Sequence, residues 1–320
     1  MRVLLALGGN AMTNAQGRAR PEDQIAAAEV AMAEVADLVA HGVDVVITHG
    51  NGPQVGNLLV KNELAAGVVP PVPLDWCGAQ TQATLGFVLM NALDPALARL
   101  GVDRSGATVV TRVLVDADDP GFTRPTKPIG RYLSREEAAV LVEHGETWED
   151  RGEKGWRRVV ASPEPREIVD AAAIRALVEA GLVVVAAGGG GVPVVRDPDG
   201  SLRGVEAVID KDLAAALLAR TVAAEVLVVA TDVPAAVLRF GQPDAEPLGR
   251  VGVSPLRKYA AEGHFASGSM GPKVEAACRF VEYGGDRAVI TDLAHIVDAV
   301  TGETGTVVVP DQQAQLETDS

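Results

Sequence analysis

The sequence is poor in cysteine, in aromatic side chains and in positive charge. It has 2 cysteines and 3% aromatic residues in 320 positions, and Cys77 and Cys278 lie far apart without the spacing of metal ligands. We therefore expect neither a disulfide framework nor a zinc site, and predict that both cysteines are buried as small apolar residues. The 43 acidic and 28 basic side chains give a formal net charge of −15, so the chain lacks the basic surface typical of proteins that bind nucleic acids or anionic membranes.

Long hydrophobic runs are also missing. The apolar run at 3–7 ends at two glycines and is too short for a signal peptide, and no later run has the length of a transmembrane helix. Hydrophobic residues nevertheless make up 48% of the chain, which is enough for a large buried core. These features predict a soluble, cytoplasmic protein built as a single domain over residues 1–320.

Short apolar runs alternate with amphipathic segments along most of the chain. Strands are expected at 2–7 and 43–48, with a helix at 21–42 between them. The same alternation recurs as helix-then-strand pairs expected over 167–191, 211–232 and 271–292. Nearly continuous Val, Leu and Ala strands between helices predict an α/β fold in which helices cover both faces of a mainly parallel sheet. Ligands in such folds bind at the carboxyl ends of the strands.

Residues 116–160 interrupt this alternation. The segment is rich in charged residues, proline and glycine, and it contains Trp148 and Trp156, two of the 3 tryptophans. A short helix is expected at 134–144. The segment is either a surface excursion or an inserted subdomain that carries residues over the site as a lid, and its composition favours the surface excursion.

Glycine-rich turns follow the predicted strands. The sequences are "LGGNA" (7–11), "HGNGPQVG" (49–56), "AAGGGGVP" (186–193) and "FASGSMGPK" (265–273), the last of which opens a helix. Such turns expose backbone N–H groups, and helix N-termini after them favour anions, so together they indicate a phosphate site. The Walker loop does not fit, because no Gly-Lys is followed by Ser or Thr. The Rossmann fingerprint does not fit either, because Gly50, Gly52 and Gly56 are spaced one residue too far.

Lys127, Lys211 and Lys273 differ from ordinary surface lysines in their sequence context. Each lies beside a glycine or proline turn or in an otherwise apolar run, and Lys211 stands between Asp210 and Asp212 where an apolar helix begins. This triplet is either a salt-bridged helix start or a cation that carboxylates position toward a transferring phosphoryl group. Phosphoryl transfer depends mainly on fixed positive charge, so three convergent lysines and an N–H cradle would suit it.

Several longer motifs carry a specific resemblance. They are "ALGGNA", "THGNGPQVG", "LDWCGAQTQATLGF", "PTKPIG", "VVAAGGGGVPV", "GVEAVIDKDLAAALLA" and "GHFASGSMGPKVEAACRFVEYGG". Together they resemble the carbamate kinases of the amino acid kinase family. The resemblance implies a three-layer α/β/α sandwich with residues 116–160 as an inserted, protruding lid subdomain, a homodimer, and reversible phosphoryl transfer between ATP and carbamate. The reaction would usually make ATP from ADP and carbamoyl phosphate in arginine catabolism, the arginine deiminase pathway. Mg²⁺ would be carried by the nucleotide rather than by a metal site on the protein.

The resemblance also implies roles for individual residues. The catalytic groups would be the three lysines together with the carboxylate that orients two of them: Lys127, Lys211, Lys273 and Asp212. The substrate and its phosphate would be bound by the turn residues Gly8, Gly9, Asn10, Gly50, Asn51 and Gly52. The nucleotide would contact Gly189, Gly190, Thr231, Asp232, Val233, Met270 and Gly271.

Three positions depart from the pattern usual in that family. Pro234 stands where an acidic residue is common and Val237 where an aromatic residue is common, which predicts altered contacts with adenine. Arg131 stands where proline is frequent, which predicts a different stiffness of the lid.

Two alternatives stay open. Another carboxylate kinase of the family, such as acetylglutamate or glutamate kinase, generally carries a lysine in the first glycine turn, which "LALGG" lacks. A non-catalytic metabolite-binding protein on the same fold is expected to lose at least one of the four catalytic groups, and all four are present here. Carbamate is already an anionic nucleophile and requires no general base, so His49 is interpreted as a structural residue.

Overall fold

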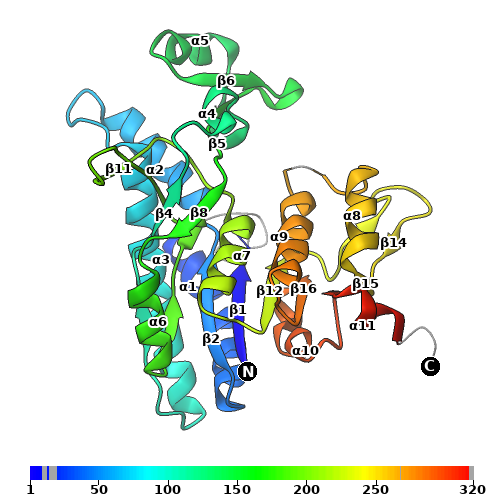
Figure 1. The fold of residues 1–320 in the computed structure, drawn as a ribbon. Helices are drawn as coiled ribbons and strands as arrows, with labels where there is room; N and C mark the ends of the chain where they lie inside the picture. Colours follow the sequence, from blue (N-terminus) through cyan, green and yellow to red (C-terminus); the bar gives the residue numbers. More distant parts are fainter. Residues whose placement is uncertain (9–12, 14–19, 267, 317–320) are drawn as a thin grey trace.

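An eight-stranded sheet forms the centre of this computed structural model (Figure 1). The structure describes residues 1–8, 13, 20–266 and 268–316. The strand order in the sheet is β15-β17-β16-β12-β1-β2-β9-β3. These strands are β1 (Arg2–Leu7), β2 (Asp44–His49), β3 (Gly106–Thr108), β9 (Val183–Val185), β12 (Val226–Thr231), β15 (Arg250–Gly252), β16 (Arg287–Asp292) and β17 (Thr306–Val309).

The strands are mainly parallel, and the antiparallel pairing lies between β16 and β17. Strand β1 pairs with β12 on one side and β2 on the other, and its residues from Val3 to Leu7 are fully buried. Because these three strands are parallel neighbours, their last residues Leu7, His49 and Thr231 lie at one edge of the sheet. The glycine turns predicted after β1 and β2 therefore begin at the same edge.

Helices cover both faces of the sheet. Alternate strand residues such as Leu5, Ile47 and Val228 share one core with α1 (Pro21–Ala40), α3 (Leu74–Arg99) and α10 (Ile296–Thr301). The intervening residues, such as Leu4, Val46 and Leu227, share the other core with α6 (Ala171–Glu179), α7 (Lys211–Thr221), α8 (Val253–Ala261) and α9 (Met270–Glu282). Side chains along a strand point alternately to its two faces, so each strand contributes side chains to both cores. The predicted three-layer α/β/α architecture is confirmed.

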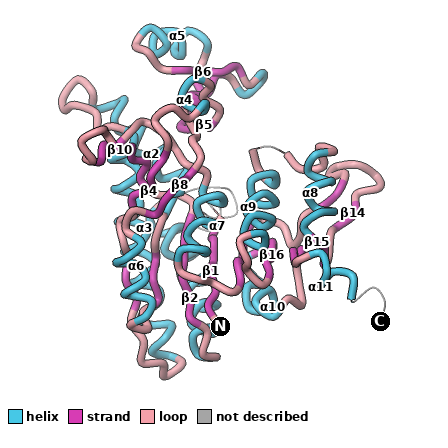
Figure 2. The backbone as a smooth tube through the Cα atoms, in the orientation of Figure 1, coloured by secondary structure: helices cyan, strands magenta, loops and turns pink. Residues whose placement is uncertain are grey.

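A smaller four-stranded sheet lies beside the core and carries the segment at 116–160. Its order is β11 (Leu202–Gly204), β10 (Val192–Arg196), β4 (Arg112–Val115) and β8 (Pro165–Ile168). Between β4 and β8 the chain forms what we call the protruding segment, residues 116–160, which projects at the top of Figures 1 and 2.

The protruding segment has a sheet and a small core of its own. Its elements are α4 (Pro120–Thr123), β5 (Lys127–Leu133), α5 (Arg135–Glu143), β6 (Thr147–Asp150), the 3₁₀ helix η2 (Gly152–Lys154) and β7 (Trp156–Val160). The three strands pair in the order β5-β7-β6, and Leu133, Ala138 and Trp148 pack together beneath them. Whether the segment closes over the site as a lid stays a prediction.

The glycine turn predicted at 49–56 is shorter than expected. Helix α2 (Gly52–Ala65) already begins inside it, so Gly50 and Asn51 alone connect β2 to the helix. Pro53 lies in the first helical turn, where a residue without an N–H group costs no intrahelical hydrogen bond. The N-terminus of α2, with its free N–H groups, therefore lies at the carboxyl edge of the sheet.

The remaining elements are short connections and a terminal helix: β13 (Val237–Leu238), β14 (Glu246–Pro247), η3 (Gly188–Gly190), η4 (Leu293–His295) and α11 (Asp311–Leu316). Cys77 and Cys278 are buried and not joined in a disulfide, as predicted. None of the helices in the described part of the chain has the length and apolar content that a membrane span requires.

Candidate active site

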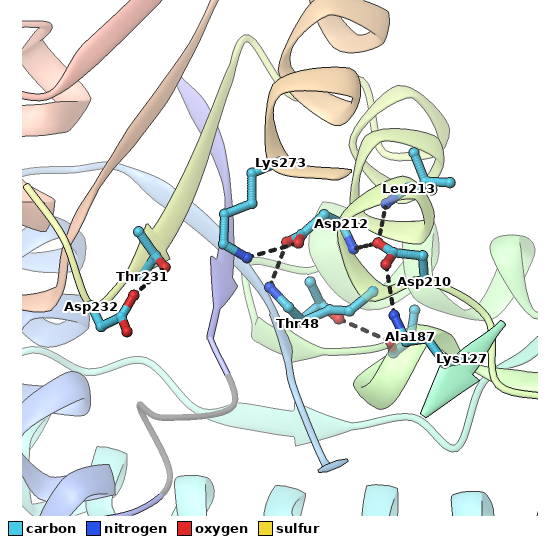
Figure 3. Close-up of polar contacts among 10 residues, drawn as sticks. Thr48, Lys127, Ala187, Asp210, Asp212, Leu213, Thr231, Asp232 and Lys273 are labelled. Atoms are coloured by element: carbon cyan, nitrogen blue, oxygen red, sulfur yellow. Dashed lines mark hydrogen bonds and ion pairs between the residues drawn. The ribbon is translucent and has the colours of Figure 1, made fainter. Parts of the chain in front are cut away.

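The N-terminus of α7 lies at the edge where the parallel strands end. Asp210 caps the helix, because its Oδ1 accepts the backbone N–H groups of Asp212 at 2.9 Å and Leu213 at 3.4 Å. Its second oxygen, Oδ2, accepts a hydrogen bond from Lys127 Nζ at 2.7 Å (Figure 3). One carboxylate thus holds both the helix start and a lysine that comes from β5 of the protruding segment.

Asp212 holds the other two predicted lysines. Its Oδ1 accepts from Lys211 Nζ at 2.6 Å, and its Oδ2 accepts from Lys273 Nζ at 2.9 Å. Burial alone would raise the pKa of Asp212, but the two ammonium groups outweigh it and lower that pKa to about 2. The carboxylate is therefore charged at neutral pH and holds two lysines together against their mutual repulsion.

The lysine charges are largely shielded from bulk water. The side chains of Lys211 and Lys273 are 12% and 13% exposed. Burial lowers the pKa of Lys211, an effect that the neighbouring Lys273 reinforces and the Asp212 carboxylate opposes. Electrostatic attraction for an added anion is stronger in such a place than at an exposed surface. The triplet at 210–212 is thus a salt-bridged helix start and also a site of fixed positive charge.

Two cavities meet at Lys127 and Lys211, which line both of them. The smaller cavity, of about 260 Å³, is also lined by Gly8, Thr231, Asp232 and Lys273. The larger cavity, of about 810 Å³, is also lined by Gly50, Asn51 and Gly52. The structure thus brings the three predicted lysines together, and it places two of them in the wall between the cavities. An anionic group at that wall would contact lysines from both sides.

The glycines after β9 allow close packing against the end of β2. A Cβ atom added to Gly188 would lie 2.3 Å from His49 Nε2, and one added to Gly189 would lie 2.0 Å from Asn51 Nδ2. Gly189 has a φ of +66° and lines the larger cavity together with Asn51. Gly190 packs against the backbone of Ile209. Gly189 therefore lies in the lining of the larger cavity and Gly190 beside Ile209, another of its lining residues, and the contact of either glycine with a nucleotide stays a prediction.

The other predicted nucleotide residues divide into two groups. Thr231 Oγ1 donates to Asp232 Oδ1 at 3.1 Å (Figure 3). Both residues line the smaller cavity. Val233, Met270 and Gly271 do not line it, and around the start of α9 their neighbours Gly268, Ser269 and Pro272 do so instead. Gly9 and Asn10, predicted to bind phosphate, lie outside the described residues.

His49 lies behind the lining of the larger cavity and is buried, with 1% of its surface exposed. Its Nδ1 is 3.0 Å from the carbonyl oxygen of Gly50, so the neutral ring donates its Nδ1 proton there. Its Nε2 has no hydrogen-bond partner among the described residues. Burial lowers the pKa of His49 to about 4, and the nearby Lys211 contributes in the same direction. The structural interpretation of His49 agrees with this geometry.

The buried imidazole makes stability depend on pH. Because the pKa is about 4 in the folded chain and about 6.5 unfolded, stability is complete above pH 6.5 and is lost as pH falls toward 4. We expect this group alone to remove about 2 kcal/mol of unfolding free energy between pH 7 and pH 5. Urea unfolding at the two pH values should show that His49→Gln loses less unfolding free energy between pH 7 and pH 5 than the native chain does. The exposed His144→Gln variant should lose as much unfolding free energy as the native chain. An equal loss in the native chain and both variants would contradict the assignment of this pH dependence to His49.

Two residues of the site were not predicted from the sequence as functional. Asp210 was noted only as a neighbour of Lys211, although an aspartate just before an apolar helix is typical of an N-cap. Arg157, on β7, also lines the larger cavity. A single arginine in a charged segment carries no signal in one sequence, so only the three-dimensional structure identifies it.

The comparison with known proteins accords with this geometry. The sequence profile described as "Amino acid kinase family" matches residues 1–292. The chain belongs to the amino acid kinase family. A carbamate kinase of Thermococcus kodakarensis is 47% identical, over 96% of this chain and 99% of that protein. The carbamate kinase-like protein YahI of Escherichia coli is 44% identical, over 96% of this chain and 98% of its own.

The solved structures agree with the sequence matches. The carbamate kinase from Giardia lamblia bound to AMP-PNP superposes with a TM-score of 0.91 at 40% identity, over 97% of this chain and 98% of the other. The predicted resemblance to carbamate kinases, and with it membership of a family of phosphotransferases, is confirmed.

Proposed function

We propose that the protein is a carbamate kinase, which transfers a phosphoryl group reversibly between ATP and carbamate. The observation that carries the proposal is the shared wall of the two cavities, where Lys127 and Lys211 face both sides. The phosphates of the nucleotide occupy the smaller cavity, beside Lys273 and Thr231. Carbamate or carbamoyl phosphate occupies the larger cavity, beside Gly50 and Asn51.

The chemistry requires positioning and charge rather than proton transfer. An oxygen of carbamate attacks the γ-phosphorus of ATP, and the bond from that phosphorus to the bridging oxygen of ADP breaks. The reverse reaction forms ATP from ADP and carbamoyl phosphate. No proton is removed from the nucleophile, and the lysines stabilise the negative charge on the transferring group. This role fits lysines that Asp210 and Asp212 hold in place before any substrate enters.

Mg²⁺ enters as part of the nucleotide substrate in this proposal. Among residues 1–8, 13, 20–266 and 268–316, no three His, Cys, Asp or Glu side chains are grouped so as to hold a metal ion. Mg²⁺ commonly keeps several waters and binds through substrate phosphates with one or two carboxylates, and Asp232 at the smaller cavity is a candidate. Removing Mg²⁺ with excess EDTA should abolish turnover, and unchanged activity would contradict this part of the proposal.

A coupled assay tests the activity directly. ATP formation from ADP and carbamoyl phosphate is measured with Mg²⁺, beside reactions that offer ATP with acetylglutamate, glutamate or UMP. Rapid ATP formation with carbamoyl phosphate alone is the expected result. Turnover of another acceptor would favour a different carboxylate kinase. Thermal stabilisation by carbamoyl phosphate without turnover would favour a metabolite-binding protein.

Lys127 is expected to contribute less to turnover than the two lysines bound to Asp212. It comes from the protruding segment, so we propose that it adds its charge fully only when this segment closes over the substrates. Lys127→Ala should lower kcat by about 10-fold, which is the loss of one partly engaged charged contact. Steady-state assays with Lys154→Ala, an exposed lysine of the same segment, serve as the control. Equal effects in the two variants would contradict a specific role for Lys127.

The proposal extends to assembly and context. Trp76 and Phe87 are 60% and 64% exposed and lie about three turns apart on α3, so they face the same side of the helix. We propose that this face joins two chains in a homodimer, which sedimentation equilibrium would test, since a monomer at micromolar concentration would contradict it.

Cytoplasmic ATP synthesis in arginine catabolism, by the arginine deiminase pathway, is the proposed setting, and genes of that pathway beside this one would support it.

A further inference from the structure

The larger cavity has a charge opposite to that of the whole protein. The chain carries a net charge of −15, yet the charged residues among the described lining of this cavity are all basic: Arg20, Lys127, Arg131, Arg157 and Lys211. No aspartate or glutamate is among the described lining residues. A cationic cavity in an acidic protein concentrates anions locally against the repulsion of the remaining surface.

Four of the five basic side chains already have a carboxylate partner. The nitrogen-to-oxygen distances are 4.0 Å for Arg20 to Glu22, 2.7 Å for Lys127 to Asp210, 3.1 Å for Arg131 to Glu63 and 2.6 Å for Lys211 to Asp212. Arg157 differs, because no carboxylate of the described chain lies within ion-pair distance of its guanidinium. Its Nε atom is buried and has no hydrogen-bond partner there.

The neighbours of Arg157 hold its side chain without neutralising it. Tyr132 is its partner across the β5–β7 pair, and the guanidinium carbon lies 5.0 Å from the centre of the tyrosine ring. One terminal nitrogen donates to the tyrosine hydroxyl at 3.4 Å. Glu149 stands opposite Arg157 on β6, but its carboxylate is bound by Arg151 at 2.6 Å. The charge of Arg157 is thus positioned by an aromatic ring and left available to a ligand.

We propose that Arg157 binds the anionic substrate in the larger cavity, carbamoyl phosphate in one direction and carbamate in the other. The inference rests on the proposed carbamate kinase function and adds a substrate-binding residue to it. The planar guanidinium can donate two parallel hydrogen bonds to a phosphate or a carboxylate, which a lysine cannot do. Because Arg157 lines the larger cavity and does not line the smaller one, it acts on this substrate and not on ADP.

Kinetics with each substrate varied separately test the proposal. Arg157→Ala should raise KM for carbamoyl phosphate about 10- to 100-fold, the usual effect of losing a hydrogen bond to a charged group, while KM for ADP stays unchanged. Arg157→Lys should have a KM for carbamoyl phosphate between those of the alanine variant and the native protein, because lysine keeps the positive charge but cannot donate two parallel hydrogen bonds. Arg135→Ala removes the same charge from an exposed position of the same segment outside the cavity and should leave both constants unchanged.

Binding measured without turnover separates this inference from the proposed function. The probe is phosphonoacetamide, in which a methylene group replaces the bridging oxygen of carbamoyl phosphate, titrated by calorimetry. Weaker binding to Arg157→Ala but not to Arg135→Ala would support the role of Arg157 even if the native protein showed no turnover. Native affinity in Arg157→Ala, or an equal rise of both KM values, would overturn it.

Discussion

Replacing Lys211 or Lys273 with alanine is expected to lower kcat for ATP formation by about 100- to 1,000-fold, the usual cost of removing one preorganised charged donor from a transition state. Both ammonium groups are nearly buried and are held within 3 Å of Asp212, at 2.6 and 2.9 Å. They need no rearrangement when charge develops on the transferring phosphoryl group, so their loss should reduce kcat more than it raises KM.

The comparison needs folded variants and a neutral control. Circular dichroism should show native secondary structure in both variants, because the α/β core does not depend on these side chains. Lys258→Ala is the control, since that side chain on α8 is 73% exposed and lies outside both cavities. Turnover near the native value in either Lys211→Ala or Lys273→Ala would refute the catalytic assignment.

Asp212→Asn is expected to impair both stability and activity. The carboxylate is 6% exposed and lies between two buried ammonium groups, so its neutralisation leaves two positive charges facing each other. Breaking a buried ion pair in this way costs about 3–5 kcal/mol of unfolding free energy. Urea unfolding at pH 7 measures this loss. Turnover should fall with it, because Lys211 and Lys273 then lose the group that orients them.

The contribution of Asp212 to stability can be checked in two independent ways, by its dependence on pH and by comparison with a matched variant. The folded pKa of Asp212, about 2, lies below its ordinary value, so its contribution to stability is complete above about pH 4 and is lost as pH falls toward 2. Asp44→Asn is the control, because Asp44 is 38% exposed and pairs with Arg104 far from the cavities, so it should cost less than about 1 kcal/mol. A loss in Asp212→Asn as small as in Asp44→Asn would contradict a structural role for the buried pair.

Arg131 shows how a departure from the family's usual pattern takes its meaning from the fold. Sequence comparison alone predicted a change in stiffness where proline is frequent. In the structure its guanidinium binds Glu63 of α2 at 3.1 Å, which ties the protruding segment to the body of the domain. The neighbouring Gly130 approaches Gly56 of the same helix, where an added Cβ atom would lie 3.7 Å from the Gly130 Cα. A contact between distant segments decides the effect of this residue.

Local patterns in the sequence determined the layers of this protein. The valine and leucine runs of β1, β2 and β12 are buried on both faces, and the helices between them have the expected apolar sides, so the parallel sandwich follows from periodicity. The start of α7 was equally predictable, because Asp210 and Asp212 act within one helical turn of Lys211. These features depend on interactions between residues that are near one another in the chain.

The tertiary structure alone decided how the charges are shared. Lys127 reaches Asp210 across 83 positions of sequence, and Lys273 reaches Asp212 across 61. Gly189 lies beside Asn51, and among the described residues Arg157 has no carboxylate partner while Arg131 has one. One sequence shows which side chains carry charge. Which of these charges are neutralised by the protein, and which stay available to a ligand, depends on distances that only the packed chain defines.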